Sequence, residues 1–301
     1  MYDVVIIGSG IAGLTSAIYA LQAEKSVLII EKEIYGGLVI NSPEIDNYPG
    51  FSNISGFELM KKIHDQALNL GAEEINGNVE KITKDKEITL HNNKVIKAKS
   101  IIIATGLTIK NLGLENEDKF FGKGISYCAT CDGYFYRKKD VLVVGGGNTA
   151  LEDAIYLSNI CNKVYLVHRR DEFRGNSRLV TNIKKCKNIS IITDSIITSI
   201  NGEEKLSSAT IKNNKTNEEK NIDIDGLFVA IGHIPETDFC KDIIELTKDS
   251  FVASNELCHT NVDGIFVAGD VRDKKLRQLV TAASDGAVAG NEAVEYLNNE
   301  I

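Results

Sequence analysis

Cysteine is scarce in this chain, with 6 among 301 residues. A density this low excludes the class of small secreted domains that are held together by disulfides. Only Cys128 and Cys131 lie close enough in sequence to form a small reversible disulfide, and the other four cysteines are isolated. In a reducing compartment a lasting bridge needs a catalytic or sensing reason, so this pair is the first candidate for chemistry.

Excess basic charge and long apolar runs are also missing. Lysine and arginine number 34 against 42 acidic residues, which gives a net charge of −8 and a pI near 5.3. The chain lacks the basic footprint of a nucleic-acid-binding protein, and an anionic membrane surface would repel it. No apolar run approaches the roughly 18 residues of a membrane helix. A strand-like run begins at Tyr2, so we expect no signal peptide. We expect a cytoplasmic protein that acts on small molecules or proteins, with no nucleic-acid or membrane partner.

The first glycine-rich segment lies between a strand and a helix. A β-branched run at residues 3–7 breaks into Gly8-Ser9-Gly10-Ile11-Ala12-Gly13, and a helix-like pattern continues to Leu21. The first glycine permits the tight turn, the second lets the backbone approach a pyrophosphate, and the third allows close packing of helix on strand. A second strand at residues 26–30 ends at Glu31, near the position at which an acid accepts a ribose hydroxyl. The combination predicts an adenine dinucleotide site; a plain glycine turn beside a surface glutamate is the alternative.

Other segments of the first half are candidates to line the same cofactor. Gly36-Gly37 and residues 46–50 mark turns, which by composition alone are equally well ordinary loops. A buried strand at residues 100–104 runs into Thr105-Gly106. Small residues at the end of a buried strand let another group approach the backbone closely.

A second glycine-rich segment repeats this plan. Residues 141–144 break into Gly145-Gly146-Gly147-Asn148-Thr149-Ala150, followed by a helix to about Ile160. The next strand, residues 164–167, ends in His168-Arg169-Arg170, with Arg174 soon after. An acid here would repel a 2′-phosphate, whereas arginines bind one bidentately, so the site is predicted to take NADP rather than NAD. A solvated basic turn is the alternative.

The length and an apolar content of 43% predict two hydrophobic cores and two domains. A strand at residues 226–230 ends in Ile231-Gly232, and we assign a later strand and helix, residues 264–270 and 276–297, back to the first domain. The expected fold class is α/β, with two Rossmann-like, three-layer dinucleotide-binding domains. The second domain, residues 113–241, is inserted into the first, residues 1–112 and 242–301. The other elements expected from periodicity are a helix over residues 57–70, strands over residues 88–90 and 95–96, and a polar surface hairpin over residues 201–219.

Three readings compete for Cys128 and Cys131. Structural zinc is disfavoured, because it normally takes four ligands, often in two close pairs, and the other cysteines are isolated. Haem attachment is disfavoured as well, because it needs a histidine at the position of Asp132. Two unreactive buried cysteines are a second possibility. A redox pair is favoured, because Asp132 can hold or deliver the proton that a leaving thiol needs. The alternative for Asp132 is a carboxylate stabilised by the helix dipole in a first helical turn.

The two dinucleotide sites can be ordered by their chemistry. NADPH gives up its electrons as a hydride, whereas a disulfide is opened by sulfur-centred exchange. A flavin is competent with both, so the first site is predicted to hold FAD.

With these residues assembled, the chain resembles the low-molecular-weight thioredoxin reductases, a class of pyridine nucleotide-disulfide oxidoreductases, along essentially its whole length. The resemblance implies a homodimer that passes electrons from NADPH through FAD and the cysteine pair to thioredoxin or a similar small dithiol protein. It also implies that the domains rotate, that Cys131 lies nearer the isoalloxazine, and that Cys128 attacks thioredoxin. The matching segments are Gly8 to Gly13, Asn47-Tyr48-Pro49-Gly50, Cys128 to Asp132, Gly145 to Ala150, His168 to Arg174, Ile231-Gly232-His233, and Gly269-Asp270 with Arg277-Gln278.

Site residues follow from the motifs and the resemblance together. The expected catalytic residues are Cys128, Cys131 and Asp132. The expected FAD-binding residues are Gly8, Ser9, Gly10, Ile11, Ala12, Gly13, Glu31, Lys32, Gly36, Gly37, Leu38, Asn47, Ala104, Thr105, Gly106, Gly269, Asp270, Arg277, Gln278 and Leu279. The expected NADPH-binding residues are Gly145, Gly147, Asn148, Thr149, Ala150, His168, Arg169, Arg170, Arg174, Ile231 and Gly232. No metal site is expected.

Two positions depart from the family pattern, since Leu38 replaces a common glutamine and Ile11 a frequent proline; both bear on flavin potential and FAD affinity. Some relatives take electrons from ferredoxin or a deazaflavin, and the segment from His168 to Arg174 argues against that donor here. Two further functions stay open. One is the reductase of a peroxidase system, which typically carries an extra N-terminal redox domain, and the other is a non-enzymatic redox sensor.

Overall fold

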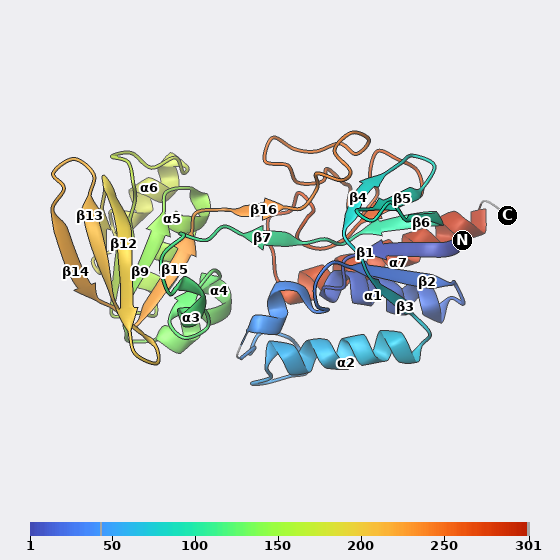
Figure 1. Cartoon of the computed structure of the whole chain (residues 1–301). Helices are drawn as coiled ribbons and strands as arrows, with labels where there is room; N and C mark the ends of the chain where they lie inside the picture. Colours follow the sequence, from blue (N-terminus) through green and yellow to red (C-terminus); the bar gives the residue numbers. More distant parts are fainter. Residues whose placement is uncertain (43, 300–301) are drawn as a thin grey trace. The chain divides into compact units, whose positions relative to one another are not determined.

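The computed structural model describes residues 1–42 and 44–299. The chain forms two compact units: Met1–Thr108 together with the chain from Ile234 onward, and Ile109–His233 (Figure 1). The sequence placed these joins at residues 112 and 241, a few residues further along. The connecting segments are themselves short strands, β7 (Leu107–Ile109) and β16 (His233–Pro235), which pair with each other. The confirmed class is α/β with two Rossmann-like units, the second inserted into the first.

A seven-stranded sheet forms the centre of the first unit, in the order β3-β2-β1-β6-β5-β4, with β17 also pairing with β6. The parallel strands end at the same edge of the sheet. In their registers Ile7 is paired with both Ile30 and Ile103, and Val267 is paired with Ile103. The segments that follow β1, β2, β6 and β17 are therefore neighbours. The parallel strands are β1 (Tyr2–Ile7), β2 (Val27–Glu31), β3 (Glu73–Asn76), β6 (Val95–Ile103) and β17 (Ile265–Val267), and β4 (Val79–Ile82) and β5 (Glu87–Leu90) pair antiparallel.

Strand β6 corrects the prediction of two separate strands at residues 95–96 and 100–104. Its first residues alternate between exposed and buried, where they pair antiparallel with β5, and its last four are fully buried against β1 and β17. One strand thus changes from a half-exposed to a buried pattern, and the change conceals its continuity in the sequence.

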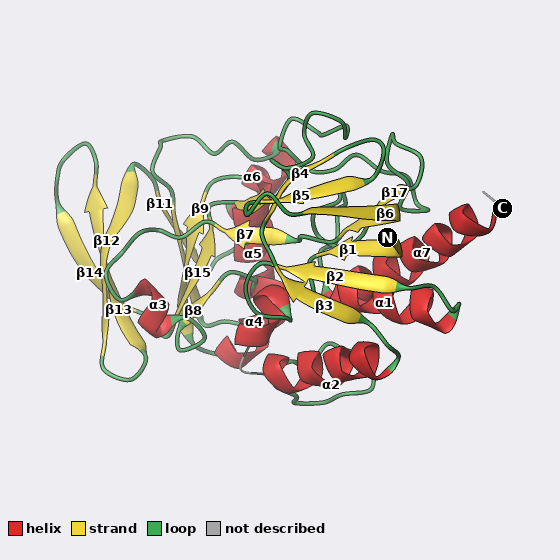
Figure 2. Ribbon diagram, turned by 45° about the vertical axis from the view of Figure 1, so that its right-hand side comes forward, coloured by secondary structure: helices red, strands yellow, loops and turns green. Residues whose placement is uncertain are grey.

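Helices α1 (Ile11–Gln22) and α7 (Leu279–Asn299) cover one face of this sheet (Figure 2). The two helices can approach closely because Gly286 has no side chain. A Cβ at this position would lie only 2.3 Å from the Ala12 carbonyl oxygen. Helix α2 (Gly56–Asn69) is capped by Ser55, whose hydroxyl accepts the Glu58 N–H at 3.2 Å. A 3₁₀ turn, η1, spans Gly37–Asn41. On the other face, sheet residues such as Ile88 form a second core with Ile244 and Val252 from the chain between β16 and β17.

The second unit contains a five-stranded parallel sheet in the order β11-β10-β9-β15-β8. Helix α5 packs on one face of the sheet. A three-stranded antiparallel sheet packs on the other face and contributes Ile197, Leu206 and Ile222 to the core. The elements are β8 (Ile125–Ser126), β9 (Asp140–Gly145), β10 (Lys163–Val167), β11 (Ile189–Ile192) and β15 (Gly226–Ala230); α3 (Glu117–Phe120), α4 (Ala129–Asp132), η2 (Gly133–Tyr136), α5 (Asn148–Ser158) and α6 (Ser177–Ile183); and β12 (Ser195–Gly202), β13 (Leu206–Asn213) and β14 (Glu219–Asp223).

The three-stranded sheet corrects the predicted surface hairpin at residues 201–219. Strands β12 and β13 do form a hairpin, but β14 adds to it and one face of the sheet is buried. Lysines and glutamates, most of them in the turns between the strands, dominate the composition of residues 201–219, so the apolar residues of the covered face escape notice.

Candidate functional site

The first glycine loop is closed by contacts that only glycine allows. A Cβ on Gly8 would lie 2.4 Å from the Ala104 carbonyl oxygen, and a Cβ on Gly13 would lie 2.0 Å from the Gly8 carbonyl oxygen. Gly10 caps α1 without any side-chain hydrogen bond. The first N–H groups of α1 therefore remain available to an anion such as a pyrophosphate.

Glu31 lies beside this loop at the end of β2. Its Oε2 accepts both the N–H and the hydroxyl of Ser9, each at 2.8 Å, and its Oε1 accepts the Glu33 N–H at 3.0 Å. The acid predicted to meet a ribose thus also fixes the glycine loop. Lys32, which follows it, pairs with Glu236 at 2.5 Å.

The paired glycines lie against the same loop. The Gly36 N–H donates to the Ser9 carbonyl at 3.0 Å, and a Cβ on Gly37 would lie 3.6 Å from the Gly10 Cα. Both glycines have positive φ angles, 105° and 58°, which favour glycine. The neighbouring Leu38 is 43% exposed, so the departure from the family pattern leaves an apolar side chain at the surface of this region.

Asp270 has a buried carboxylate oxygen, Oδ1, without a hydrogen-bond donor among the described residues. Burial raises the pKa of the carboxyl to about 6. An unpaired buried acceptor is costly, and a ligand hydroxyl would satisfy it. The ribityl chain of FAD supplies such hydroxyls, so this atom and the glycine cradle fit the cofactor that the sequence predicts.

A network from α7 holds the Gly269-Asp270 turn. Asp285 accepts the Gly269 N–H at 3.1 Å, the Arg272 guanidinium at 2.6 Å and the Lys274 ammonium at 2.7 Å. Arg277 Nε donates to the Asp270 carbonyl at 3.2 Å, and its guanidinium lies 4.2 Å from the Phe251 ring centroid. The sequence did not predict a role for Asp285. The one local sign of such a role is an acidic residue within a helix rich in small residues.

The remaining predicted FAD residues gather around these groups. Asn47 Nδ2 donates to Gln278 Oε1 at 3.1 Å, which brings a loop before α2 to the start of α7, and Leu279 begins that helix. Thr105 follows β6 and donates to the Glu236 carbonyl at 2.9 Å, and Gly106 has a positive φ of 66°.

The second glycine loop repeats the geometry of the first. A Cβ on Gly145 would lie 2.3 Å from the Ala230 carbonyl oxygen and 2.7 Å from the Ala150 Cβ. Gly147 caps α5 without a side-chain hydrogen bond, so the N–H groups of this helix also remain available. Thr149 and Ala150 lie in the first turn of α5, and Ile231-Gly232 follows β15 beside Gly145.

His168 lies beneath this loop. Its ring is 4% exposed, stacks on Phe173 with centroids 5.2 Å apart, and occupies the space that a Cβ on Gly146 would need, only 2.1 Å away. Nε2 lies 3.1 Å from the Glu172 carbonyl oxygen, and burial lowers the pKa of the imidazole. His168 therefore supports the loop as a packed neutral ring, and Gly146, which the sequence reasoning left out, is required for that packing.

The three arginines at the end of β10 are free for an anion. Arg169, Arg170 and Arg174 are exposed, and across residues 1–42 and 44–299 none of them forms an ion pair. The Arg174 N–H donates to the Gly146 carbonyl at 2.8 Å, so this arginine is tied to the glycine loop. Asn148 also contributes to the loop, since its Oδ1 accepts the Asn176 N–H at 2.7 Å.

Cys128 and Cys131 form a disulfide across the short helix α4, with an S–S distance of 2.07 Å and a Cα–Cα distance of 5.3 Å. Cys131 is exposed and Cys128 is half-buried. Asp132 follows directly, and its Oδ2 accepts the Ser126 hydroxyl at 2.6 Å. Burial raises the pKa of Asp132, and the Ser126 hydrogen bond opposes that rise. Ser126 carries no motif signal, and sequence reasoning missed it.

Three of the free cysteines are inert by comparison. Burial raises the pKa of the thiols of Cys161, Cys240 and Cys258 to about 11, 12 and 11. They remain protonated near neutral pH, so they are not thiolate nucleophiles.

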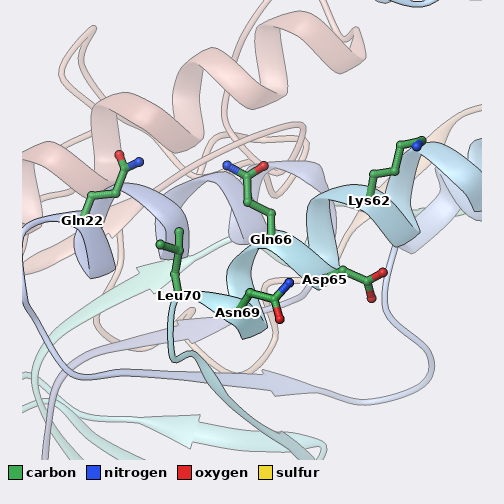
Figure 3. Close-up of a pocket in the computed structure, with 6 residues that line it drawn as sticks. All are labelled: Gln22, Lys62, Asp65, Gln66, Asn69 and Leu70. Atoms are coloured by element: carbon green, nitrogen blue, oxygen red, sulfur yellow. The ribbon is translucent and has the colours of Figure 1, made fainter.

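A surface hollow of about 490 Å³ lies between α1 and α2, away from these groups (Figure 3). None of the predicted site residues lines it. A second hollow, of about 460 Å³, includes Asn47 and lies along residues 46–52. Within the described chain no helix combines the length and the apolar character that a membrane crossing needs.

Comparison with known proteins gives full-length matches. The family model described as pyridine nucleotide-disulphide oxidoreductase matches residues 2–286. A Clostridium pasteurianum protein described as a 34.2 kDa protein in the rubredoxin operon is 40% identical, covering 99% of this chain and 98% of its own length. Thioredoxin reductase of Bacillus subtilis (strain 168) is 37% identical, covering 99% of this chain and 95% of the relative. The crystal structure of thioredoxin reductase from Streptococcus pyogenes MGAS5005 is 40% identical, covers 99% of both chains and superimposes with a TM-score of 0.95.

Proposed function

Because this chain belongs to the pyridine nucleotide-disulphide oxidoreductase family, we propose that it is a thioredoxin reductase that uses NADPH and FAD. The observation that carries the proposal is the Cys128–Cys131 disulfide, which lies in the same unit as a glycine loop and three unpaired arginines. A disulfide, a site for a 2′-phosphate and a separate FAD cradle are the parts that such an enzyme needs.

In the proposed enzyme the first unit binds FAD. The glycine loop receives the pyrophosphate at the N-terminus of α1, Glu31 lies where the adenosine ribose would be, and Asp270 accepts a ribityl hydroxyl. FAD, when bound, takes the hydride-borne electron pair from NADPH and passes it to a disulfide.

The second unit binds NADPH on its own glycine loop, with Arg169, Arg170 and Arg174 supplying the charge that a 2′-phosphate requires. The cysteine pair belongs to this same unit, whereas the FAD cradle belongs to the other. Nicotinamide and disulfide must therefore reach one cofactor in turn, and the proposal includes an alternation between two arrangements of the units.

Thiol–disulfide exchange completes the reaction. Cys128, the residue that the family resemblance assigns to attack, breaks the thioredoxin disulfide as a thiolate and forms a mixed disulfide. Cys131 then re-forms the Cys128–Cys131 bond and releases the second sulfur of thioredoxin. The two protons of the enzyme dithiol end on the thioredoxin dithiol, and Asp132 carries one of them.

An anaerobic titration tests the electron path. NADPH should bleach the flavin of the purified protein, and oxidised thioredoxin should restore its colour catalytically. Cys131→Ser should abolish thioredoxin reduction while NADPH binding persists. Cys186→Ser, which removes a partly exposed thiol outside the disulfide, is the matched control and should leave turnover unchanged.

Two results would overturn parts of the proposal. Bleaching by reduced ferredoxin but not by NADPH rules out the nicotinamide donor. Bleaching by NADPH without reduction of thioredoxin favours a redox sensor or a different disulfide substrate. The proposal also includes a cytoplasmic homodimer, which light scattering of the purified holoprotein and cell fractionation would check.

A further inference from the structure

Ser126 connects Asp132 to the backbone of the cysteine turn. It ends β8, is 2% exposed, and donates its hydroxyl to Asp132 Oδ2 at 2.6 Å. Ser126 Oγ also accepts the Cys128 N–H at 3.1 Å and lies 3.3 Å from the Cys128 carbonyl oxygen. One buried hydroxyl thus meets both the candidate acid and the first cysteine.

These distances permit two hydrogen-bond arrangements. A serine hydroxyl has one proton to donate and two lone pairs that accept. When Asp132 is ionised, the Ser126 O–H donates to the carboxylate. When Asp132 is protonated, its O–H donates to Ser126 Oγ, and the Ser126 proton turns to the Cys128 carbonyl.

The cysteine turn stays fixed in both arrangements. The Cys128 N–H keeps Ser126 Oγ as its acceptor, and the Cys128 carbonyl accepts the N–H groups of Cys131 and Asp132 at 3.3 and 3.1 Å. A change in the protonation of Asp132 therefore leaves no buried donor unpaired and does not move the backbone that carries the sulfurs.

We propose that Ser126 is a positioning residue that lets Asp132 gain and lose a proton beside the disulfide while it holds the cysteine turn in place. This inference rests on the proposed function, in which thiol–disulfide exchange occurs at Cys128 and Cys131.

The surroundings of Asp132 offer no substitute for this hydrogen bond. The elements packed on α4 are η2, which carries Tyr134 and Tyr136, and α5, which carries Glu152, Asp153 and Tyr156. Among these groups Tyr136 feels the charge of Asp132: burial raises the pKa of its phenol, and that charge raises it further. In the part of the chain that the structure describes, none of these groups is a hydrogen-bond or ion-pair partner of Asp132, and no cation contributes to its pKa. Ser126 is thus the polar contact that offsets the burial of this carboxylate.

The proton balance of the exchange follows. The attacking thiol gives its proton to the Asp132 carboxylate as its sulfur forms a bond to the partner disulfide. The partner S–S bond breaks, and Asp132 O–H protonates the departing thiolate. The resulting Asp132 carboxylate again accepts a hydrogen bond from the Ser126 hydroxyl. The second exchange re-forms the Cys128–Cys131 bond and passes the remaining thiol proton to the second partner sulfur.

The test is the pH dependence of exchange in Ser126→Ala. Removing a donor to the ionised form raises the pKa of Asp132, so the pH profile of thioredoxin reduction by the reduced enzyme should shift upward by about one to two pH units. Ser126→Thr keeps the hydroxyl and should restore the native profile. Ser195→Ala is the matched control, because Ser195 is also 2% exposed in this unit but donates only to the Thr193 carbonyl at 2.8 Å.

A double-mutant cycle separates positioning from general damage. In an Asp132→Asn background, Ser126→Ala should cause no further shift, because the residue acts through that carboxyl. An unchanged profile in Ser126→Ala, a loss of rate that is equal at every pH, or effects that simply add to Asp132→Asn would overturn the inference.

A second measurement is independent of flavin and thioredoxin. Iodoacetamide alkylation of the dithiol form, followed against pH, reports the titration of the cysteine pair, and the profile should shift in Ser126→Ala but not in Ser195→Ala. If the native enzyme fails to reduce thioredoxin, the proposed function is wrong, and the alkylation profile still decides the role of Ser126.

Discussion

Glu31 and Ser9 join the end of β2 to the first glycine turn through a single carboxylate oxygen, which accepts the Ser9 N–H and hydroxyl at 2.8 Å each. The acid therefore holds the loop that we propose as the pyrophosphate site. Because Glu31 holds this loop and is proposed to contact the ribose, we expect its loss to affect FAD binding before it affects folding.

Glu31→Ala should weaken FAD binding about 10- to 100-fold, because the three hydrogen bonds to the carboxylate are lost, and the two from Ser9 anchor the loop. The dissociation constant, measured by the fluorescence of released FAD, checks this expectation. Glu33→Ala is the control, since that side chain is exposed and only its N–H touches Glu31. Equal affinities in the two variants would contradict the assignment.

FAD affinity should fall as the pH drops below about 6. A hydroxyl donated to Asp270 favours the carboxylate, so the pKa of this group in the complex lies below the value of about 6 in the free protein. FAD thus binds most tightly above that value, and affinity decreases by up to about tenfold per pH unit below it. Asp270→Asn should weaken binding and flatten the profile in a titration by fluorescence.

The same carboxyl sets a pH dependence for the stability of the protein without FAD. Its folded-state pKa of about 6 lies above the ordinary value of 3.8, so between these values the folded chain binds more protons than the unfolded chain. Asp270 therefore stabilises the fold below about pH 4 relative to higher pH, and this contribution is lost as the pH rises through about 6. Thermal unfolding of the apoprotein should show the slope, and Asp270→Asn should lack it.

Replacing Arg169 and Arg170 by alanine should raise the KM for NADPH about 10- to 100-fold and leave the KM for NADH unchanged, because only NADPH carries the 2′-phosphate. Steady-state kinetics with both nucleotides measure the difference. Lys163→Ala is the control, since this cation begins β10, the strand whose far end the arginines follow. A similar rise for both nucleotides would point to general damage instead.

Glu117→Ala should reduce the free energy of unfolding by about 2–4 kcal/mol. This carboxylate is 4% exposed and accepts the N–H groups of Leu112, Gly113 and Leu114 and the Tyr127 hydroxyl. Its removal leaves the three backbone N–H groups without this acceptor, next to the segment that leads to Cys128, whereas the Tyr127 hydroxyl keeps Asn111 Oδ1 at 3.2 Å. Urea unfolding of the holoprotein tests the prediction, and Glu115→Ala, which alters an exposed neighbour, should have little effect.

The chemistry proposed for the site follows from the sequence by itself. Both glycine fingerprints, the exchange of an acid for arginines after the second, and the Cys128–Cys131 spacing are local patterns, and each depends on chain geometry over a few residues. They were sufficient to predict two dinucleotide-binding units, FAD, NADPH and a redox disulfide, and the family comparisons confirm the fold and the class of enzyme.

The tertiary structure decided which groups support that chemistry. Ser126 meets Asp132 only because β8 ends beside α4, and Asp285 meets Gly269 only because α7 returns to the end of β17. The buried face of β12–β14 and the continuity of β6 likewise depend on which strand lies beside which. Such contacts join residues by packing and by the need of buried polar groups for partners, and neither leaves a period or a spacing in the sequence from which it can be read.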